Sequence, residues 1–136
     1  MKTIIAILYA HLVKRRNKKW INSPIKWQTN TFKKLIKNGE KTEFGKNHDF
    51  ENIESYEQYK EKVPIRDYEE LRPYIEKVVN GEIDILWPGK PLYFAKTSGT
   101  TSGAKYIPIT KESIKTHIRS ARDALLNYFL KTKNFK

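Results

Sequence analysis

Hydrophobic residues recur at helical spacing in the first forty residues. Ile4, Ile5, Leu8 and Leu12 form one stripe, which we expect to cover a core. A second helix is predicted from Ser23 and Pro24, a favourable cap and first helical residue, to about Gly39. Its apolar face would hold Ile25, Phe32, Leu35 and Ile36.

Two shorter helices are predicted from their capping residues. Ser55 and Gln58 have the spacing of a capping box, which opens a helix to about Lys62 before Pro64 breaks it. Asp67 begins the next helix, which Asn80 and Gly81 end. Its first turn contains Glu69 and Glu70, so capping and the helix dipole account for this acidic group.

The pattern changes after residue 86. Residues 87–91, Trp-Pro-Gly-Lys-Pro, predict a rigid loop, and residues 92–95 are typical of a short buried strand. Residues 105–109 predict a second strand, where Pro108 favours an edge or a strand end. Thr110 would cap a last helix. The apolar face of that helix would contain Ile114, His117, Ile118, Ala121, Leu125 and Tyr128.

The order of elements predicts an α/β fold. Residues 1–90 form a mainly helical lead-in, and residues 91–136 form a strand, a loop, a strand and a helix. With 136 residues, the chain is one ordinary domain or part of a larger one. We find no internal repeat. The absence of cysteine excludes a disulfide framework and fits a reducing compartment, so we expect a cytoplasmic protein.

The formal net charge of +12 is unevenly distributed. Lys and Arg outnumber Asp and Glu by 12 to 2 in residues 1–48 and by 9 to 2 in residues 95–136, whereas residues 49–94 contain 6 basic and 11 acidic side chains. A positive surface attracts polyanions. The acidic middle nevertheless argues against a nucleic-acid partner. Contact of residues 1–19 with an anionic membrane remains a secondary alternative.

The apolar start of the chain does not predict a membrane span. A transmembrane helix needs about 20 mainly apolar residues, and this run is broken by His11 and closed by Lys14. A secretory leader is not expected either, because no small-residue cleavage pattern follows.

The segment with the clearest chemistry is 97–105, Thr-Ser-Gly-Thr-Thr-Ser-Gly-Ala-Lys. Five of the six residues from 97 to 102 carry a hydroxyl group, and Gly99 and Gly103 allow unusual backbone angles. Such a loop can direct several donors at a phosphate, and Lys96 and Lys105 would add charge. The spacing excludes the G-x-x-x-x-G-K-[ST] loop and the G-x-S-x-G elbow. A plain polar connection between two strands remains the alternative.

These residues resemble the adenylate-forming superfamily, whose loop has the form S-G-T-T-G-x-P-K. Residues 98–101 and Lys105 keep that register, but the next glycine comes one place late, at Gly103, and Ala104 replaces proline. In this respect the loop is similar to the Gretchen Hagen family of auxin-responsive acyl-acid amido synthetases, with its pattern S-S-G-T-[ST]-x-G. Thr97 replaces the first serine of that pattern and keeps the hydroxyl group.

Upstream phrases extend the resemblance to most of residues 42–110. Residues 42–46 (Thr-Glu-Phe-Gly-Lys), 63–68 (Val-Pro-Ile-Arg-Asp-Tyr), 81–82 (Gly-Glu) and 87–89 (Trp-Pro-Gly) all look like the amino-terminal region of the family, and its bacterial branch is the closer likeness. The chain is therefore similar to an amino-terminal fragment of the large N-terminal domain of an adenylate-forming enzyme.

The resemblance implies a ligase that activates a carboxylic acid with ATP as an acyl-adenylate and transfers the acyl group to an amine or amino acid. It implies that the ATP phosphates are held by Ser98, Gly99, Thr100, Thr101, Ser102 and Gly103. Lys105 would assist the phosphates or anchor the second strand. No catalytic residue or Mg²⁺ ligand is expected within this chain, because the family places them further along.

The resemblance also implies an incomplete sheet. In the family a parallel sheet supports these strands, and much of it lies beyond the matching region. We therefore expect Leu92, Phe94, Ile107 and the apolar face of the last helix to be underburied, and we do not expect this chain alone to catalyse adenylation.

The remaining polar and aromatic residues suggest no independent activity. His11, His48 and His117 lack the spacing of metal ligands, and we expect His117 at the edge of a core. Trp20, Trp27 and Trp87 are expected to anchor packing. Two other functional hypotheses remain, a basic module that binds nucleic acid or anionic membrane, and a truncated remnant without function.

Overall fold

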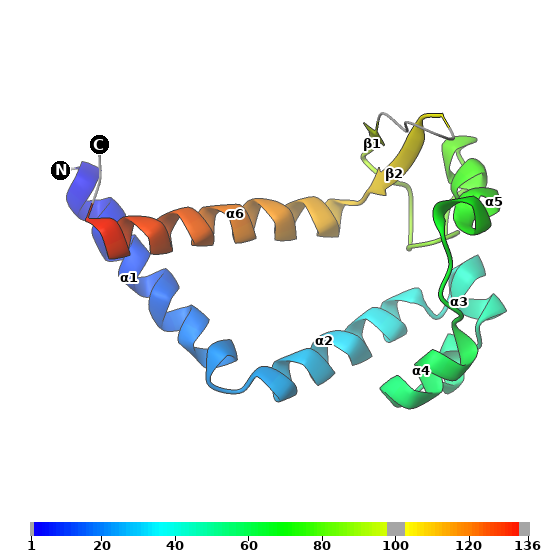
Figure 1. Cartoon of the computed structure of the whole chain (residues 1–136), viewed down its shortest axis with the longest axis horizontal. Coiled ribbons are helices and arrows are strands. Elements are labelled where there is room, and N and C mark those ends of the chain that lie inside the picture. The colour runs from blue at the N-terminus through cyan, green and yellow to red at the C-terminus, as the bar shows by residue number, and fades with distance from the viewer. Residues whose placement is uncertain (1, 98–102, 134–136) are drawn as a thin grey trace. The chain divides into compact units, whose positions relative to one another are not determined.

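The computed structural model describes residues 2–97 and 103–133, with side chains from residue 4. The described residues form mainly helices and one small sheet (Figure 1). The chain divides into two compact units, one made of residues 1–29 and 112–136, and the other of residues 30–111. Helix α2 (Pro24–Gly39) begins in the first unit and ends in the second.

The first unit is built on two long helices, α1 (Lys2–Ile21) and α6 (Lys111–Thr132). Figure 1 draws α1 in blue and α6 in orange to red. Ala10 and Val13 of α1 are 1% and 2% exposed, and Asn17 is 8% exposed. Two of these three residues are small, so a neighbouring helix can approach α1 closely along this face.

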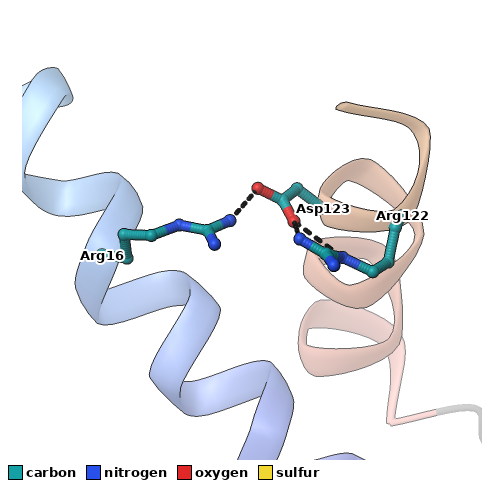
Figure 2. Close-up of polar contacts among 3 residues, drawn as sticks. All are labelled: Arg16, Arg122 and Asp123. Atoms are coloured by element: carbon teal, nitrogen blue, oxygen red, sulfur yellow. Dashed lines mark hydrogen bonds and ion pairs between the residues drawn. The ribbon is translucent and has the colours of Figure 1, made fainter. Parts of the chain in front are cut away.

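A charged cluster joins the two helices. Arg16 of α1 donates a hydrogen bond to Asp123 of α6, and Arg122 donates to the other carboxylate oxygen of Asp123 at 3.0 Å (Figure 2). The Arg122 guanidinium also lies 5.5 Å from the centre of the Tyr9 ring, within the range of a cation–π interaction. Asp123 is thus held by an arginine from each helix.

The apolar stripe predicted on α1 is real, but its expected burial is wrong. Ile4, Ile5, Leu8 and Leu12 are 62–66% exposed, and the buried residues lie on the opposite face. Helix α6, in contrast, has no buried residue, which confirms the prediction that its apolar face is underburied. Its predicted apolar face is exposed at Ile118, Leu125 and Tyr128, and His117 is exposed rather than at a core edge.

Two short helical segments at the start of the second unit were not predicted. They are α3 (Glu43–Asn47) and the 3₁₀ helix η1 (Phe50–Asn52). Thr42 caps α3, accepting from the Gly45 amide at 3.0 Å while its hydroxyl donates to the Gly39 carbonyl at 2.6 Å. This bridge closes the turn between α2 and α3, and Thr42 is only 1% exposed.

The two capping predictions are confirmed. Helix α4 (Tyr56–Lys62) opens with a capping box made by Ser55 and Gln58. Helix α5 (Tyr68–Val79) opens with a second one, made by Asp67 and Glu70. The buried aliphatic residues of the second unit come from α2, from the residue after η1, from α5 and from the loop after α5. They are Ile36, Ile53, Ile75, Val78 and Ile85.

The loop after α5 is tied to α3. The backbone amides of Glu43 and Phe44 donate to the carbonyls of Asp84 and Ile85 at 2.8 and 3.0 Å. The Glu43 carboxylate also accepts two hydrogen bonds from Lys77, at 2.7 and 2.9 Å. Donors left free at the start of α3 therefore hold the segment that leads into the sheet.

Strands β1 (Tyr93–Thr97) and β2 (Lys105–Ile109) form an antiparallel pair, with Tyr93 opposite Ile109 and Thr97 opposite Lys105. The two predicted strands are present, the loop between them lies outside the described residues at 98–102, and within the described residues the strands pair only with each other and not in a parallel sheet. The prediction that residues 92–95 form a buried strand is wrong, because only Phe94 among them is even half-buried. Leu92 and Ile107 are 56% and 47% exposed, as expected for an incomplete sheet, and Phe94 is half-buried.

The prediction that the three tryptophans anchor packing is partly wrong. Trp20 and Trp27 are 49% and 48% exposed, whereas Trp87 is half-buried. His48, in contrast, is buried, stacking on Phe44 with ring centres 4.1 Å apart while its Nδ1 lies 2.7 Å from the Phe44 carbonyl. Packing within its own turn gives His48 a structural role.

Candidate functional site

The candidate site is the turn between β1 and β2. Five of its predicted phosphate-binding residues, Ser98, Gly99, Thr100, Thr101 and Ser102, lie outside the described residues. The described flanks are Thr97, the last residue of β1, and Gly103 to Lys105, which lead into β2. Thr97 and Lys105 are paired across the sheet, so the two ends of the segment are held together.

Gly103, the first described residue after the loop, has a left-handed backbone angle. Its φ is +82°, in the region that glycine adopts without steric cost, and an added Cβ would meet no atom within 4 Å. The sequence prediction that Gly103 provides conformational freedom is therefore confirmed. Gly103 and Ala104 are exposed, so their backbone groups are accessible to a ligand.

Lys105 is positioned by helix α5. Its Nζ lies 5.2 Å from the centre of the Tyr68 ring, where the ring face attracts a cation. The Tyr68 hydroxyl oxygen accepts a hydrogen bond from the backbone amide of Tyr106 at 2.8 Å. Tyr68 is the first residue of α5, so the capping box at Asp67 and Glu70 fixes the start of the helix that steadies β2.

The strand register separates the two lysines that flank the loop. Antiparallel partners share a face, so Lys105 lies on the face of Thr97, and Lys96 lies on the opposite face with its partner Tyr106. The expectation that Lys96 and Lys105 act together on one ligand is therefore not supported by the register. The other face also contains the edge-to-face pair of Phe94 and Tyr106, whose ring centres are 6.3 Å apart.

The described flanks carry groups of the kind that bind anions. Thr97 offers a hydroxyl group, Gly103 and Ala104 offer exposed backbone groups, and Lys105 offers a charge. Residues 2–97 and 103–133 contain no group of three or more His, Asp or Glu side chains arranged to hold a metal ion. Tyr68 was missed from the sequence. Its signal was the Asp67 cap, which places the next residue at a helix start.

Comparison with known proteins gives a family match over most of the chain. The sequence model of the GH3 family N-terminal domain matches residues 13–136. No helix in the described part of the chain is both long and apolar enough to cross a membrane.

The individual proteins to which the chain is similar include plant synthetases and a plant ligase. The chain is 36% identical over 76 residues to the probable indole-3-acetic acid-amido synthetase GH3.13 of Oryza sativa subsp. japonica, covering 53% of this chain and 16% of the relative. It is 29% identical over 97 residues to the jasmonoyl-L-amino acid synthetase GH3.5 of the same plant, covering 70% of this chain and 17% of the relative. A 4-substituted benzoates-glutamate ligase, GH3.12 of Arabidopsis thaliana, is 34% identical over 79 residues, 57% of this chain and 14% of the relative. The matched part thus spans about one sixth of the length of these relatives.

Proposed function

Because the chain belongs to the GH3 family, we propose that it is the amino-terminal part of an ATP-dependent ligase that joins a carboxylic acid to an amine or amino acid. Support comes from its relatives, which are named as an amido synthetase, an amino acid synthetase and a glutamate ligase of different acids. Within this ligase, residues 1–90 are the helical lead-in, and residues 91–136 carry the phosphate loop on a strand, a second strand and a helix.

Residues 97–105 hold the ATP phosphates in this proposal. The observation that carries it is the hairpin, which pairs Thr97 with Lys105 and so brings the ends of a segment rich in hydroxyl groups together. A short loop closed by two paired strands can direct its hydroxyl and amide donors at one anion.

The loop would act on the departing pyrophosphate. When a carboxylate attacks the α-phosphorus of ATP, the bond from that phosphorus to the bridging oxygen breaks, and negative charge grows on the leaving pyrophosphate. Donors aimed at the β- and γ-phosphates stabilise this charge without reorganising during the reaction. Mg²⁺ would neutralise phosphate charge, and, as the family resemblance implies, we place its protein ligand further along the longer ligase.

Lys105 has a defined part in the proposal. The Tyr68 ring holds its ammonium group near the base of the loop, on the face shared with Thr97. This contact is compatible with both predicted roles of Lys105, assisting the phosphates and anchoring the second strand. The same interaction fixes β2 against α5 and restricts the positions of the ammonium group. Lys96, on the other face, is outside the site.

The test is ATP–pyrophosphate exchange in the longer ligase. Thr100→Ala combined with Thr101→Ala removes two donors, and we expect exchange to fall by about 100-fold, as for other preorganised donors of a reacting oxyanion. Lys96→Ala is the matched control, because it changes a flanking residue on the other face and should leave exchange unchanged. Normal exchange in the double variant would remove the loop from the mechanism.

A further inference from the structure

A face of α1 lies outside the proposed ligase site and is suited to a different ligand. Ile4, Ile5, Leu8 and Leu12 are 62–66% exposed, and helical spacing places them together opposite the buried Ala10, Val13 and Asn17. Four large aliphatic side chains side by side in water cost free energy, so such a patch marks an interaction surface.

The next turns of the same face are basic. Arg15 and Lys19 follow Leu8 and Leu12 by seven residues, two helical turns, and both are exposed. Neither makes an ion pair with an acidic residue in the described part of the chain. The face therefore changes along the helix axis from aliphatic to cationic.

Acidic residues are absent from the surrounding sequence. The first 39 residues contain no Asp or Glu. Their basic residues are Lys2, Lys14, Arg15, Arg16, Lys18, Lys19, Lys26, Lys33, Lys34 and Lys37. This charge repels a second copy of the same helix and attracts an anionic surface.

The family match does not account for this face. It begins at residue 13, so the four aliphatic residues precede the matched region, whereas the exposed residues of α6 and of the hairpin lie inside it. The rest of a GH3 domain can explain the exposed side chains of α6. The match itself gives no partner for the α1 face, whose charge is the guide to its occupant.

We propose that the α1 face formed by Ile4, Ile5, Leu8, Leu12, Arg15 and Lys19 docks on an anionic lipid bilayer. The helix lies in the interface, with its aliphatic residues at the acyl boundary and its basic residues among the headgroups. Clusters of basic residues beside apolar ones bind acidic phospholipids in this way. The docking would hold the ligase at a membrane without spanning it.

The test is flotation of the 136-residue chain with two kinds of vesicle, one of phosphatidylcholine alone and one of phosphatidylcholine with about 30% phosphatidylserine. We expect at least tenfold stronger partitioning onto the anionic vesicles, and a marked loss when salt is raised from about 0.1 to 0.5 M. Ile5→Ser with Leu8→Ser should lower partitioning at least tenfold. The matched control is Ile118→Ser with Leu125→Ser, two comparably exposed residues of α6, which should leave it unchanged.

A second variant tests the two basic residues of the α1 face. Arg15→Gln with Lys19→Gln should weaken partitioning about tenfold and reduce its salt dependence, whereas Lys111→Gln with Lys115→Gln on α6 should not. Circular dichroism checks that each variant keeps its helices. Equal partitioning on neutral and anionic vesicles, or an unchanged Ile5→Ser, Leu8→Ser variant, would overturn the proposal. So would a dimer in sedimentation without vesicles that this variant dissociates, because the face would then bind a second copy.

Discussion

At the residue scale, two residues, Thr42 and Gly45, set the turn between α2 and α3. Gly45 lies so close to the end of α2 that an added Cβ would come 2.0 Å from the Gly39 carbonyl oxygen. Thr42 bridges the same two residues, donating to the Gly39 carbonyl and receiving from the Gly45 amide. The phrase Thr-Glu-Phe-Gly-Lys, whose family resemblance was noted in the sequence, therefore has a structural reason.

Gly45→Ala should destabilise the chain by about 2–4 kcal/mol, because the new methyl group meets backbone that cannot move without opening the turn. Gly89→Ala is the control. Gly89 has a φ of +76° but no atom within 4 Å of an added Cβ, so it should cost only about 1–2 kcal/mol of backbone strain. Urea unfolding measures both. Equal losses would show that the contact with Gly39 does not govern the turn.

Thr42→Val should cost about 1–3 kcal/mol, because it leaves a carbonyl and an amide of a buried turn without their partner. Thr42→Ser keeps the hydroxyl group and should cost less. The same unfolding measurement separates the two variants, and an equally unstable serine variant would mean that the methyl group of Thr42, not its hydrogen bonds, matters.

At the element scale, local signals were predictable and packing partners were not. The capping boxes at Ser55 and Asp67 depend on residues three positions apart, so the sequence was sufficient to find them. Helix α3 has only five residues and no apolar period, so it was missed. On α1 the stripe of larger residues was chosen as the buried face, whereas the small residues Ala10 and Val13 are buried, because closeness of approach rather than hydrophobic area selects the face.

The junction of α1 and α6 makes a prediction about pH. Burial raises the pKa of the Asp123 carboxyl, but hydrogen bonds from Arg122 and Arg16 outweigh it and hold this pKa below the ordinary value of 3.8. A carboxyl group whose pKa is lower in the folded state stabilises the fold at pH values above its unfolded-state pKa. That contribution disappears as pH falls through the folded-state pKa. Arg16→Met should therefore raise the pKa of Asp123 and reduce the acid-sensitive part of stability. Carboxyl NMR titration measures it, and an unmoved pKa would show that Arg16 does not bind Asp123 in solution.

At the scale of the whole molecule, each of the two compact units exposes apolar residues that further packing would cover, on α6 in one unit and on the hairpin in the other. Ile107, Ile118 and Leu125 are 47–63% exposed, in line with the sequence prediction of underburial, and all lie within the family match. The matched part spans about one sixth of its relatives, and we propose that the remainder of a GH3 domain covers these residues. Sequence reasoning reached this point through the family resemblance, since composition alone does not reveal a missing partner.

The chain contains no cysteine, so single cysteines can report this cover. Ile118→Cys should react quickly with a thiol reagent in the 136-residue chain and at least tenfold more slowly in the longer ligase. Ile5→Cys, on the proposed membrane face, should react at similar rates in both when no lipid is present. Similar rates for Ile118→Cys in the two proteins would contradict the proposed packing.

The most direct measurement of the central claim is photocrosslinking of the longer ligase with ATP that carries a photoreactive group on its γ-phosphate. If residues 97–105 hold the phosphates, mass spectrometry should find the label in the peptide that contains them, and excess tripolyphosphate should prevent labelling. Label found elsewhere in the protein, with residues 97–105 unmodified, would contradict the assignment of this hairpin loop to ATP.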